Sequence, residues 1–465
     1  RMRSHVDDLT AVADGVKVDG FTSAVLCGMG GSSLGPEVLR RSIGSAPGFT
    51  VLRVVDTTSP EVISALRAEL DLARTLFIIS SKSGSTIEPN VLYAYFKTEL
   101  DTIVGDTAGS HFVAVTDPGS TLAVLGRDAG FRRVFLADPN IGGRYSVLSH
   151  FGLVPAAIAG IDIAKLLDSA IAVEQQLQPG SDPQESLAWQ IAAELSIAHK
   201  GGRDKVTFIE DKNSSGFGLW AEQLLAESLG KLGKGMVPIA SEPELPGGRY
   251  GPDRFIAQIS SQNALSDVPG IDSSITNPYD LGSLFLAWEY ATAVLGLDLG
   301  VQPFDQPNVQ AAKDATDRVL LEQTRTAISS VSSLSELLEK RQIGDYLAIM
   351  AFVPETDETN AVLADLRYRV SERTGLPTTL GYGPRFLHST GQLHKGGRNN
   401  ILAFQITQDH EDNPRIPGKD FGFAELIDAQ AAGDFDALTS AGRRVARAHL
   451  RGSLLEQLRD IVDSI

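Results

Sequence analysis

The chain has 465 residues, of which 42% are hydrophobic and 21% are charged, and its formal net charge is −17. This length exceeds one compact core and predicts two or three domains of ordinary globular composition. The negative charge excludes a nucleic-acid or acidic-membrane surface, so cations that recognise phosphate have to lie inside a pocket. The single cysteine, Cys27, excludes an internal disulfide and indicates a reducing, cytoplasmic setting.

A glycine-rich turn follows the first expected strand. Val25–Cys27 predicts that buried strand, residues 28–35 supply the turn, and Pro36 suits the first turn of a helix. Glycines let a backbone approach a ligand closely. The spacing differs from the dinucleotide fingerprint, because the hydroxyls of Ser32 and Ser33 replace its third glycine. The turn therefore indicates either a ligand contact or tight packing of a strand on a helix.

A hydroxyl-rich loop follows another apolar strand candidate, residues 75–79. Residues 80–86 read Ser-Ser-Lys-Ser-Gly-Ser-Thr, and a helix is expected from Glu88 to Leu100. The five hydroxyls, the ammonium of Lys82, the backbone N–H groups and the helix N-terminus can converge on one anion. The alternative is a Ser/Thr-rich turn that only caps the helix.

Strands and helices alternate along the first 140 residues. Expected strands are residues 25–27, 51–55, 75–79, 111–115 and 133–136. This alternation predicts an α/β fold with a doubly wound parallel sheet, whose ligand crevice lies at the carboxyl ends of the strands. The most apolar window, residues 151–167, contains one proline and two charged residues, which favours a core helix over a membrane span.

A second alternation begins at Val206 and predicts a second domain of the same class. The expected division is 1–170, which holds the phosphate loop, and 171–465. Further strands are expected at residues 206–209, 346–353, 378–380 and 401–406. Residues 423–462 are expected to be mostly helical.

Three charged residues outside the loop are candidates for chemistry. Arg144 follows two glycines, and an arginine fork suits an oxyanion, although a loop ion pair explains a lone arginine as well. Glu227 lies at the end of an expected helix, 220–229, where it is a surface charge unless that end faces a pocket. Lys313 is expected on a helix that begins at Pro307. A lone lysine on a helix is usually a surface residue. No Cys/His spacing indicates a structural metal site.

Taken together, five motifs resemble those of the glucose-6-phosphate isomerase family and occur in its order. They are residues 28–32, 81–86, 142–146, 227–231, and 304–306 together with Lys313. The resemblance implies two sugar-isomerase (SIS) domains, each a doubly wound parallel sheet with helices on both faces. It also implies an enzyme that interconverts glucose 6-phosphate and fructose 6-phosphate without a metal or redox cofactor.

The resemblance assigns roles to single residues. Glu227 corresponds to the base that moves a proton between neighbouring carbons through a cis-enediol(ate), and Arg144 to the group that stabilises its oxygens. His388 and Lys313 correspond to the groups that open the sugar ring. The implied substrate-binding residues are Gly31, Ser32, Ser81, Lys82, Ser83, Thr86, Glu88, Gly143 and Gln306.

The histidine motif departs from the family's order. It normally lies between the glutamate and lysine motifs, but residues 231–309 contain no histidine, and the pattern appears at 388–397. This order resembles the isomerase half of transaldolase–isomerase fusion proteins, which would also explain why the chain opens abruptly. The family is typically dimeric and takes this histidine from the neighbouring subunit. A homodimer is therefore expected, and the sequence leaves open which subunit supplies His388.

Three other functions compete with this interpretation. A non-catalytic SIS-type sugar-phosphate regulator would keep the loop but lose Glu227 and Lys313. A Schiff-base enzyme needs a lysine on a barrel strand, whereas Lys82 and Lys313 are expected on a loop and a helix. A nicotinamide dehydrogenase is disfavoured by the missing third glycine. Side activity on mannose 6-phosphate stays open.

Overall fold

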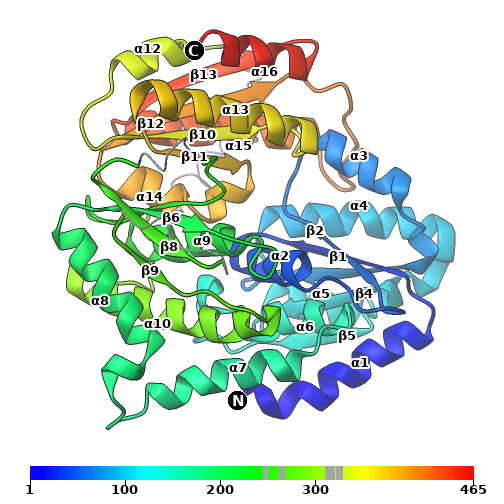
Figure 1. Cartoon of the computed structure of the whole chain (residues 1–465). Helices are drawn as coiled ribbons and strands as arrows, with labels where there is room; N and C mark the ends of the chain where they lie inside the picture. Colours follow the sequence, from blue (N-terminus) through cyan, green and yellow to red (C-terminus); the bar gives the residue numbers. More distant parts are fainter. Residues whose placement is uncertain (245–249, 261–267, 309–319, 321–327) are drawn as a thin grey trace.

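The computed structural model describes residues 1–244, 250–260, 268–308, 320 and 328–465. The named strands form three sheets, and every pairing among them is parallel. Figure 1 shows a five-stranded sheet at the right, one four-stranded sheet at the left and another at the top. The predicted class, parallel sheets flanked by helices, is confirmed.

The first sheet has the strand order β2-β1-β3-β4-β5. Its strands are β1 (Ser23–Gly28), β2 (Val51–Val55), β3 (Thr75–Ser80), β4 (Phe112–Thr116) and β5 (Arg133–Leu136). The helices of this part of the chain are α1 (Val6–Val18), α2 (Leu34–Ser42), α3 (Pro60–Glu69), α4 (Ile87–Val104), α5 (Thr121–Asp128), α6 (His150–Ile158) and α7 (Ile163–Gln176), and α7 packs mainly on α10 of the second sheet. The strand order reverses between β1 and β3, and ligands bind outside the carboxyl ends of such a pair.

The second sheet has the order β7-β6-β8-β9, and the third has the order β11-β10-β12-β13. The second contains β6 (Lys205–Ile209), β7 (Val237–Ile239), β8 (Arg254–Gln258) and β9 (Gly270–Asp272), with α8 (Leu187–Lys200), α9 (Phe217–Leu229) and α10 (Leu281–Leu299). The third contains β10 (Tyr346–Phe352), β11 (Thr378–Tyr382), β12 (Ile401–Gln408) and β13 (Arg444–Leu450), with α12 (Leu334–Glu339), α13 (Asp357–Thr374), α14 (Gly391–Gly396), α15 (Phe423–Ser440) and α16 (Leu454–Asp463). The edge strands β7 and β11 contact each other.

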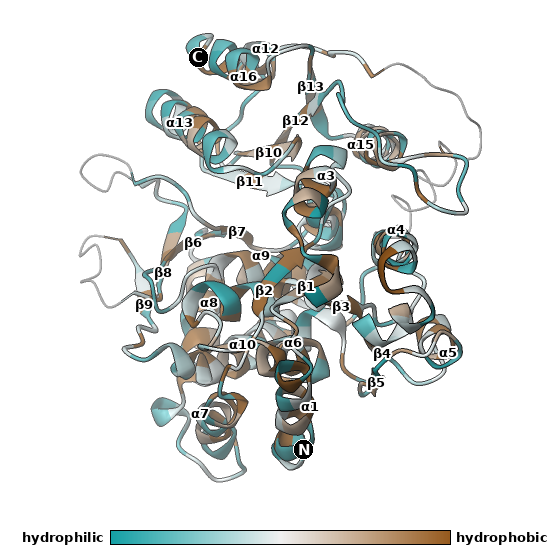
Figure 2. Ribbon diagram, turned by 90° about the vertical axis from the view of Figure 1, so that its right-hand side faces the viewer, coloured by the Kyte–Doolittle hydropathy of each residue, from teal (hydrophilic) through white to brown (hydrophobic). Residues whose placement is uncertain are grey.

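Hydrophobic cores connect the three sheets. Strands β1 and β3 are buried along nearly their whole length. Leu26 of β1 belongs to the same cluster as Trp288 of α10, so the first and second sheets share a core. Ile239 of β7 clusters with Phe386, which follows β11, and this joins the second sheet to the third. Figure 2 shows hydrophobic residues gathered in the strands at the centre of the molecule.

One expected helix is interrupted in the structure. Residues 151–167 do not form one helix: α6 ends near Gly160, which has φ +77°, and α7 begins after Asp162, whose side chain accepts a hydrogen bond from the Lys165 amide. A left-handed glycine and a capping aspartate end one helix and start another. Residues 423–462 are mostly helical, as expected, in α15 and α16; between these helices, residues 444–450 form strand β13, which pairs with β12.

The second expected domain contains two of the three sheets. Strands β7, β8 and β9 are short and were not expected from the sequence, since three to five residues carry little periodicity. The division at residue 170 stays a prediction. In the described part of the chain, no helix combines the length and hydropathy needed to cross a bilayer.

A buried histidine joins the first and third sheets. His410 Nδ1 lies 2.7 Å from the Glu61 carboxylate on α3, and its Nε2 lies 3.5 Å from Asp428 on α15. Burial lowers the pKa of His410, but the two carboxylates outweigh burial and raise it to about 9. A folded-state pKa above the unfolded value stabilises the fold below pH ~6.5, and this stabilisation is lost as pH rises through about 9.

Replacing His410 by glutamine is therefore expected to cost more stability at pH 6 than at pH 9.5. Because Asp428 is partly exposed, we expect the difference between the two pH values to be about 2–3 kcal/mol. Urea unfolding of both proteins at several pH values measures it. A cost that is the same at every pH would mean that the charge of His410 does not hold the two sheets together.

Candidate active site

Two loops begin at register-matched ends of the neighbouring strands β1 and β3. Gly28 of β1 and Ser80 of β3 are register partners, so the glycine turn and the hydroxyl loop begin side by side. Gly30–Ser32 form a short 3₁₀ helix, η2, in which Gly30 has φ +54°. A Cβ on Gly31 would lie 2.0 Å from the Gly143 carbonyl oxygen. Gly30 is therefore needed for the backbone conformation of the turn, and Gly31 for its packing against the segment that carries Arg144.

Arg144 is buried and its hydrogen-bonding groups are fully engaged. It lies on the 3₁₀ helix η5 (Gly143–Tyr145), and its side chain is 3% exposed. Its Nη1 donates to Glu227 Oε1 at 2.7 Å, and its Nε donates to Ser228 Oγ at 2.8 Å. Its Nη2 donates to the carbonyl oxygens of Pro303 and Asp305 at 2.6 and 3.0 Å. The guanidinium therefore joins η5 to α9 and to the 303–306 segment.

Glu227 lies at the carboxyl end of α9, and its side chain is 9% exposed. Its second oxygen accepts a hydrogen bond from Gln223 Nε2 at 2.9 Å, one helical turn earlier. Burial raises the pKa of Glu227 above the ordinary glutamate value, while Arg144 and Gln223 act against this rise. A carboxylate with a raised pKa, held by two donors, has the properties of a general base.

His388 reaches this site from the third sheet. It ends the 3₁₀ helix η9 (Arg385–His388), and its Nε2 lies 2.9 Å from Glu88 Oε1 at the start of α4. The same Gln223 amide that holds Glu227 also donates to the His388 carbonyl oxygen at 2.9 Å. A Cβ on Gly30 would lie 2.6 Å from that oxygen. The turn that carries His388, η9 (the histidine turn), therefore contacts both the glycine turn and helix α9 within one chain.

Four of the five hydroxyls in residues 80–86, the candidate phosphate loop, bond to one another in pairs. Ser81 Oγ donates to Thr86 Oγ1 at 3.0 Å and accepts from the Gly84 amide at 3.2 Å. Ser83 Oγ lies 2.8 Å from Ser85 Oγ. Thr86 precedes α4, and its side chain makes no capping bond to that helix. These hydroxyls and the first amides of an 18-residue helix form a compact set of donors for an anion.

Lys82 does not join this set of donors. Its ammonium pairs with Asp117 after β4 and donates to the Pro139 carbonyl oxygen at 2.9 Å. Gln306 lies beside Arg144, because its Oε1 accepts a hydrogen bond from Arg144 Nη1 at 3.3 Å. Ser32 is buried in the glycine turn. Lys313 lies outside the described residues.

A known protein family matches the first half of the chain. The sequence model of the family described as Phosphoglucose isomerase matches residues 1–233 of the 465.

The chain belongs to the phosphoglucose isomerase family. A glucose-6-phosphate isomerase of Rubrobacter xylanophilus is 28% identical in an alignment 374 positions long that covers 68% of this chain and 86% of that protein. A solved hypothetical protein of Thermus thermophilus is 26% identical with a TM-score of 0.57, and the match covers 69% of this chain and 90% of that one. A solved glucose-6-phosphate isomerase of Chlamydia trachomatis, at 19% identity, has a TM-score of 0.55 over 70% of this chain and 74% of its own. The predicted enzyme class is thereby confirmed, and the likeness at 19% supports the fold alone.

Several residues of the candidate site were not among the site residues predicted from the sequence. Gln223 lies four residues before Glu227, so the helical period was a signal for it. Tyr145 and Ser228 flank predicted residues, and their hydroxyls lie 2.9 Å apart. Gln430 of α15 donates a hydrogen bond to Glu88 Oε1 at 2.7 Å, and no local sequence pattern predicts this contact. Among the described residues, no group of three or more His, Cys, Asp or Glu side chains is arranged to hold a metal ion.

Proposed function

We propose that the protein interconverts glucose 6-phosphate and fructose 6-phosphate, with Glu227 moving one proton between C1 and C2 through a cis-enediol(ate). One observation carries this proposal: a buried carboxylate of raised pKa is paired at 2.7 Å with a buried arginine. Membership of the family supports the same substrate pair. The roles of the single residues are all part of the proposal.

The proton transfer needs a base and an electrostatic partner. Ionised Glu227 takes the proton from C2 of the open aldose and returns it to C1, because both positions lie on the same face of the cis-enediolate. General base catalysis of this kind contributes about 10²–10⁴-fold. Arg144 stabilises the negative charge that develops on the O1 and O2 oxygens, which is often the largest single contribution.

Ring opening is the task of the histidine. His388, oriented by Glu88, transfers a proton to the ring oxygen, and Lys313 acts on the hydroxyl proton that leaves at the same time. The rest of the substrate contacts the loops. Gly31, Ser32, Gly143 and Gln306 line the sugar, and its phosphate binds Ser81, Ser83 and Thr86. Lys82 lies near the phosphate and contributes its positive charge there, although its ammonium pairs with Asp117.

Removing the loop hydroxyls is expected to weaken substrate binding more than chemistry. We expect the Ser81→Ala/Thr86→Ala double variant to raise KM for fructose 6-phosphate about 10- to 100-fold, since two bonds to a charged group are lost. Thr98→Ala is the matched control, because its hydroxyl is exposed on α4, and its described hydrogen bond goes to the Ala94 carbonyl oxygen in its own turn. An unchanged KM in the double variant would remove this loop from the phosphate site.

A coupled assay tests the function itself. The protein is mixed with fructose 6-phosphate, glucose-6-phosphate dehydrogenase and NADP, and NADPH formation is followed. The proposal predicts turnover that depends on this protein. Binding of fructose 6-phosphate without any turnover would instead identify a sugar-phosphate regulator.

Assembly and setting are also proposals. We propose a homodimer in a reducing cytoplasm, covalently fused to a transaldolase domain in the natural polypeptide. The support for fusion is the order of the motifs, with His388 after Lys313. Because His388 already contacts Glu88 of the same chain, we propose that it acts within its own subunit. Light scattering should give twice the mass of the chain, and a single mass would exclude the dimer.

A further inference from the structure

The histidine turn has to be aligned with a different part of the molecule. His388 belongs to η9, which follows β11 of the third sheet, whereas Glu88 begins α4 on the first sheet. Phe386, in the middle of η9, packs on Phe352 with ring centroids 5.3 Å apart and so fixes the turn to its own sheet. Some other contact has to set its position relative to the first sheet.

Arg385 supplies such a contact at the first residue of η9. Its Nε donates to Asp56 Oδ2 at 2.9 Å, and its Nη2 donates to Glu355 Oε2 at 2.6 Å. Asp56 directly follows β2 of the first sheet and is buried, and Glu355 follows β10 of the third. Both carboxylates lie at carboxyl ends of strands, so one guanidinium joins two sheets three residues before His388.

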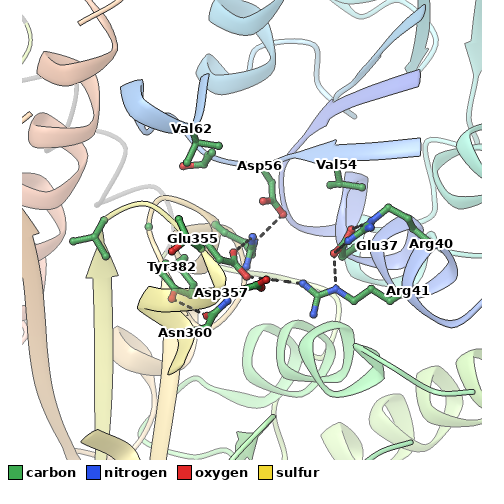
Figure 3. A pocket seen from close by; sticks show the side chains of 15 residues that line it. Glu37, Arg40, Arg41, Val54, Asp56, Val62, Glu355, Asp357, Asn360 and Tyr382 are labelled. Atoms are coloured by element: carbon green, nitrogen blue, oxygen red, sulfur yellow. Dashed lines mark hydrogen bonds and ion pairs between the residues drawn. The ribbon is translucent and has the colours of Figure 1, made fainter. Parts of the chain in front are cut away.

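Further charges extend this bridge to the helix behind the glycine turn. Arg41 of α2 lies 3.9 Å from the other oxygen of Glu355 and 2.5 Å from Glu37 in its own helix. Glu37 also pairs with Arg40 at 2.7 Å. These side chains line a cavity of about 280 Å³. Figure 3 shows them pointing toward one another from α2 and from the segment after β10. On this side of η9, ion pairs therefore join the third sheet to the first.

We propose that Arg385 is a positioning residue: its ion pair with Asp56 aligns the histidine turn on the first sheet and holds His388 against Glu88. This inference rests on the proposed ring-opening role of His388. It predicts a defect confined to ring opening, because Arg385 touches neither Glu227 nor Arg144 through any described hydrogen bond or ion pair.

Two substrates separate ring opening from proton transfer. Fructose 6-phosphate is mostly a closed ring, whereas 5-deoxyfructose 6-phosphate lacks the hydroxyl that closes it and stays open. The first is followed by the coupled assay and the second by deuterium incorporation at C1 in D₂O. Arg385→Gln is expected to lower kcat on fructose 6-phosphate about 10- to 100-fold, as a displacement near 1 Å can do, with deuterium incorporation within about twofold of the natural protein.

Three further variants make the test specific. Arg385→Lys keeps the charge and should recover part of the loss. Asp56→Asn removes the other partner and should reproduce the defect, even if Arg385→Gln does not fold. Arg40→Gln is the matched control: it removes a guanidinium of the same cavity that attracts Asp56 and Glu355 through space, but whose described hydrogen bonds all go to Glu37 of its own helix, so it separates the direct bond of Arg385 from the general charge. It should leave both rates unchanged.

A readout without catalysis separates this inference from the proposed function. The imidazole NMR signals of His388, assigned with His388→Ala, should move in Arg385→Gln and Asp56→Asn but not in Arg40→Gln. Unmoved signals together with unchanged kcat would overturn the positioning role, as would an equal loss on both substrates. If the natural protein turned over no fructose 6-phosphate, the proposed function would fail, and the NMR signals would still decide whether Arg385 positions His388.

Discussion

Replacing Glu227 by glutamine is expected to lower kcat for fructose 6-phosphate about 10³-fold while KM changes less than about twofold. Glutamine has nearly the same volume, and its oxygen can still accept the hydrogen bond that Arg144 donates at 2.7 Å. It has no carboxylate to accept a proton. Steady-state kinetics in the coupled assay, with sugar-phosphate binding measured separately, would show lost turnover with retained binding.

Glu222 provides the matched control for this variant. It lies on the same helix, is buried, and accepts a hydrogen bond from the Ala240 amide at 3.1 Å. Burial raises its pKa to about 7, so a glutamine imitates its protonated form. We expect Glu222→Gln to keep kcat within about twofold. Near-normal turnover in Glu227→Gln, or an equal loss in both variants, would place the base elsewhere.

Replacing Arg144 by methionine is expected to affect both catalysis and stability. Loss of its charge at the enediolate should lower kcat about 10²–10³-fold. The same charge holds down the pKa of Glu227, which burial raises. Without it that pKa rises further, and because the base acts only when ionised, the acid limb of the activity profile should move to higher pH. A pH–rate profile of residual activity measures this shift.

Replacing Arg144 by methionine is also expected to lower the stability of the fold. Removing one partner of a buried ion pair leaves the other charge uncompensated, at a cost of about 3–5 kcal/mol. The Arg144→Met/Glu227→Gln double variant should recover much of that loss, because the unpaired charge is gone. Urea unfolding of the single and double variants forms a double-mutant cycle. Strictly additive losses, with an unshifted pH profile, would argue that the two side chains are not coupled.

Local sequence patterns predicted the elements that place the site. The strand candidates before the glycine turn and before the hydroxyl loop became β1 and β3, whose carboxyl ends are adjacent. Gly143 and Arg144 were singled out by spacing and family resemblance, and the structure gives the reason: Gly31 has no room for a Cβ beside Gly143. Such signals depend on a few consecutive residues and are visible without a structure.

Features that depend on distant contacts could not be predicted in this way. Gln430 reaches Glu88 from a helix more than 300 positions away, and nothing local marks it. Residues 444–450 lie within a segment expected to be mostly helical, but pairing with β12 makes them a strand. Lys82 was expected near the phosphate, yet a carboxylate on the neighbouring loop attracts its ammonium. In each case a tertiary partner outweighed the local preference.

The most direct test of the central claim follows the proton itself. Glucose 6-phosphate carrying deuterium at C2 is converted by the natural protein and by Glu227→Gln, and NMR follows the label. The account predicts that the natural protein moves part of the deuterium to C1 and releases the rest to water, whereas Glu227→Gln leaves it at C2. Loss of deuterium from C2 at an undiminished rate in Glu227→Gln would contradict the account.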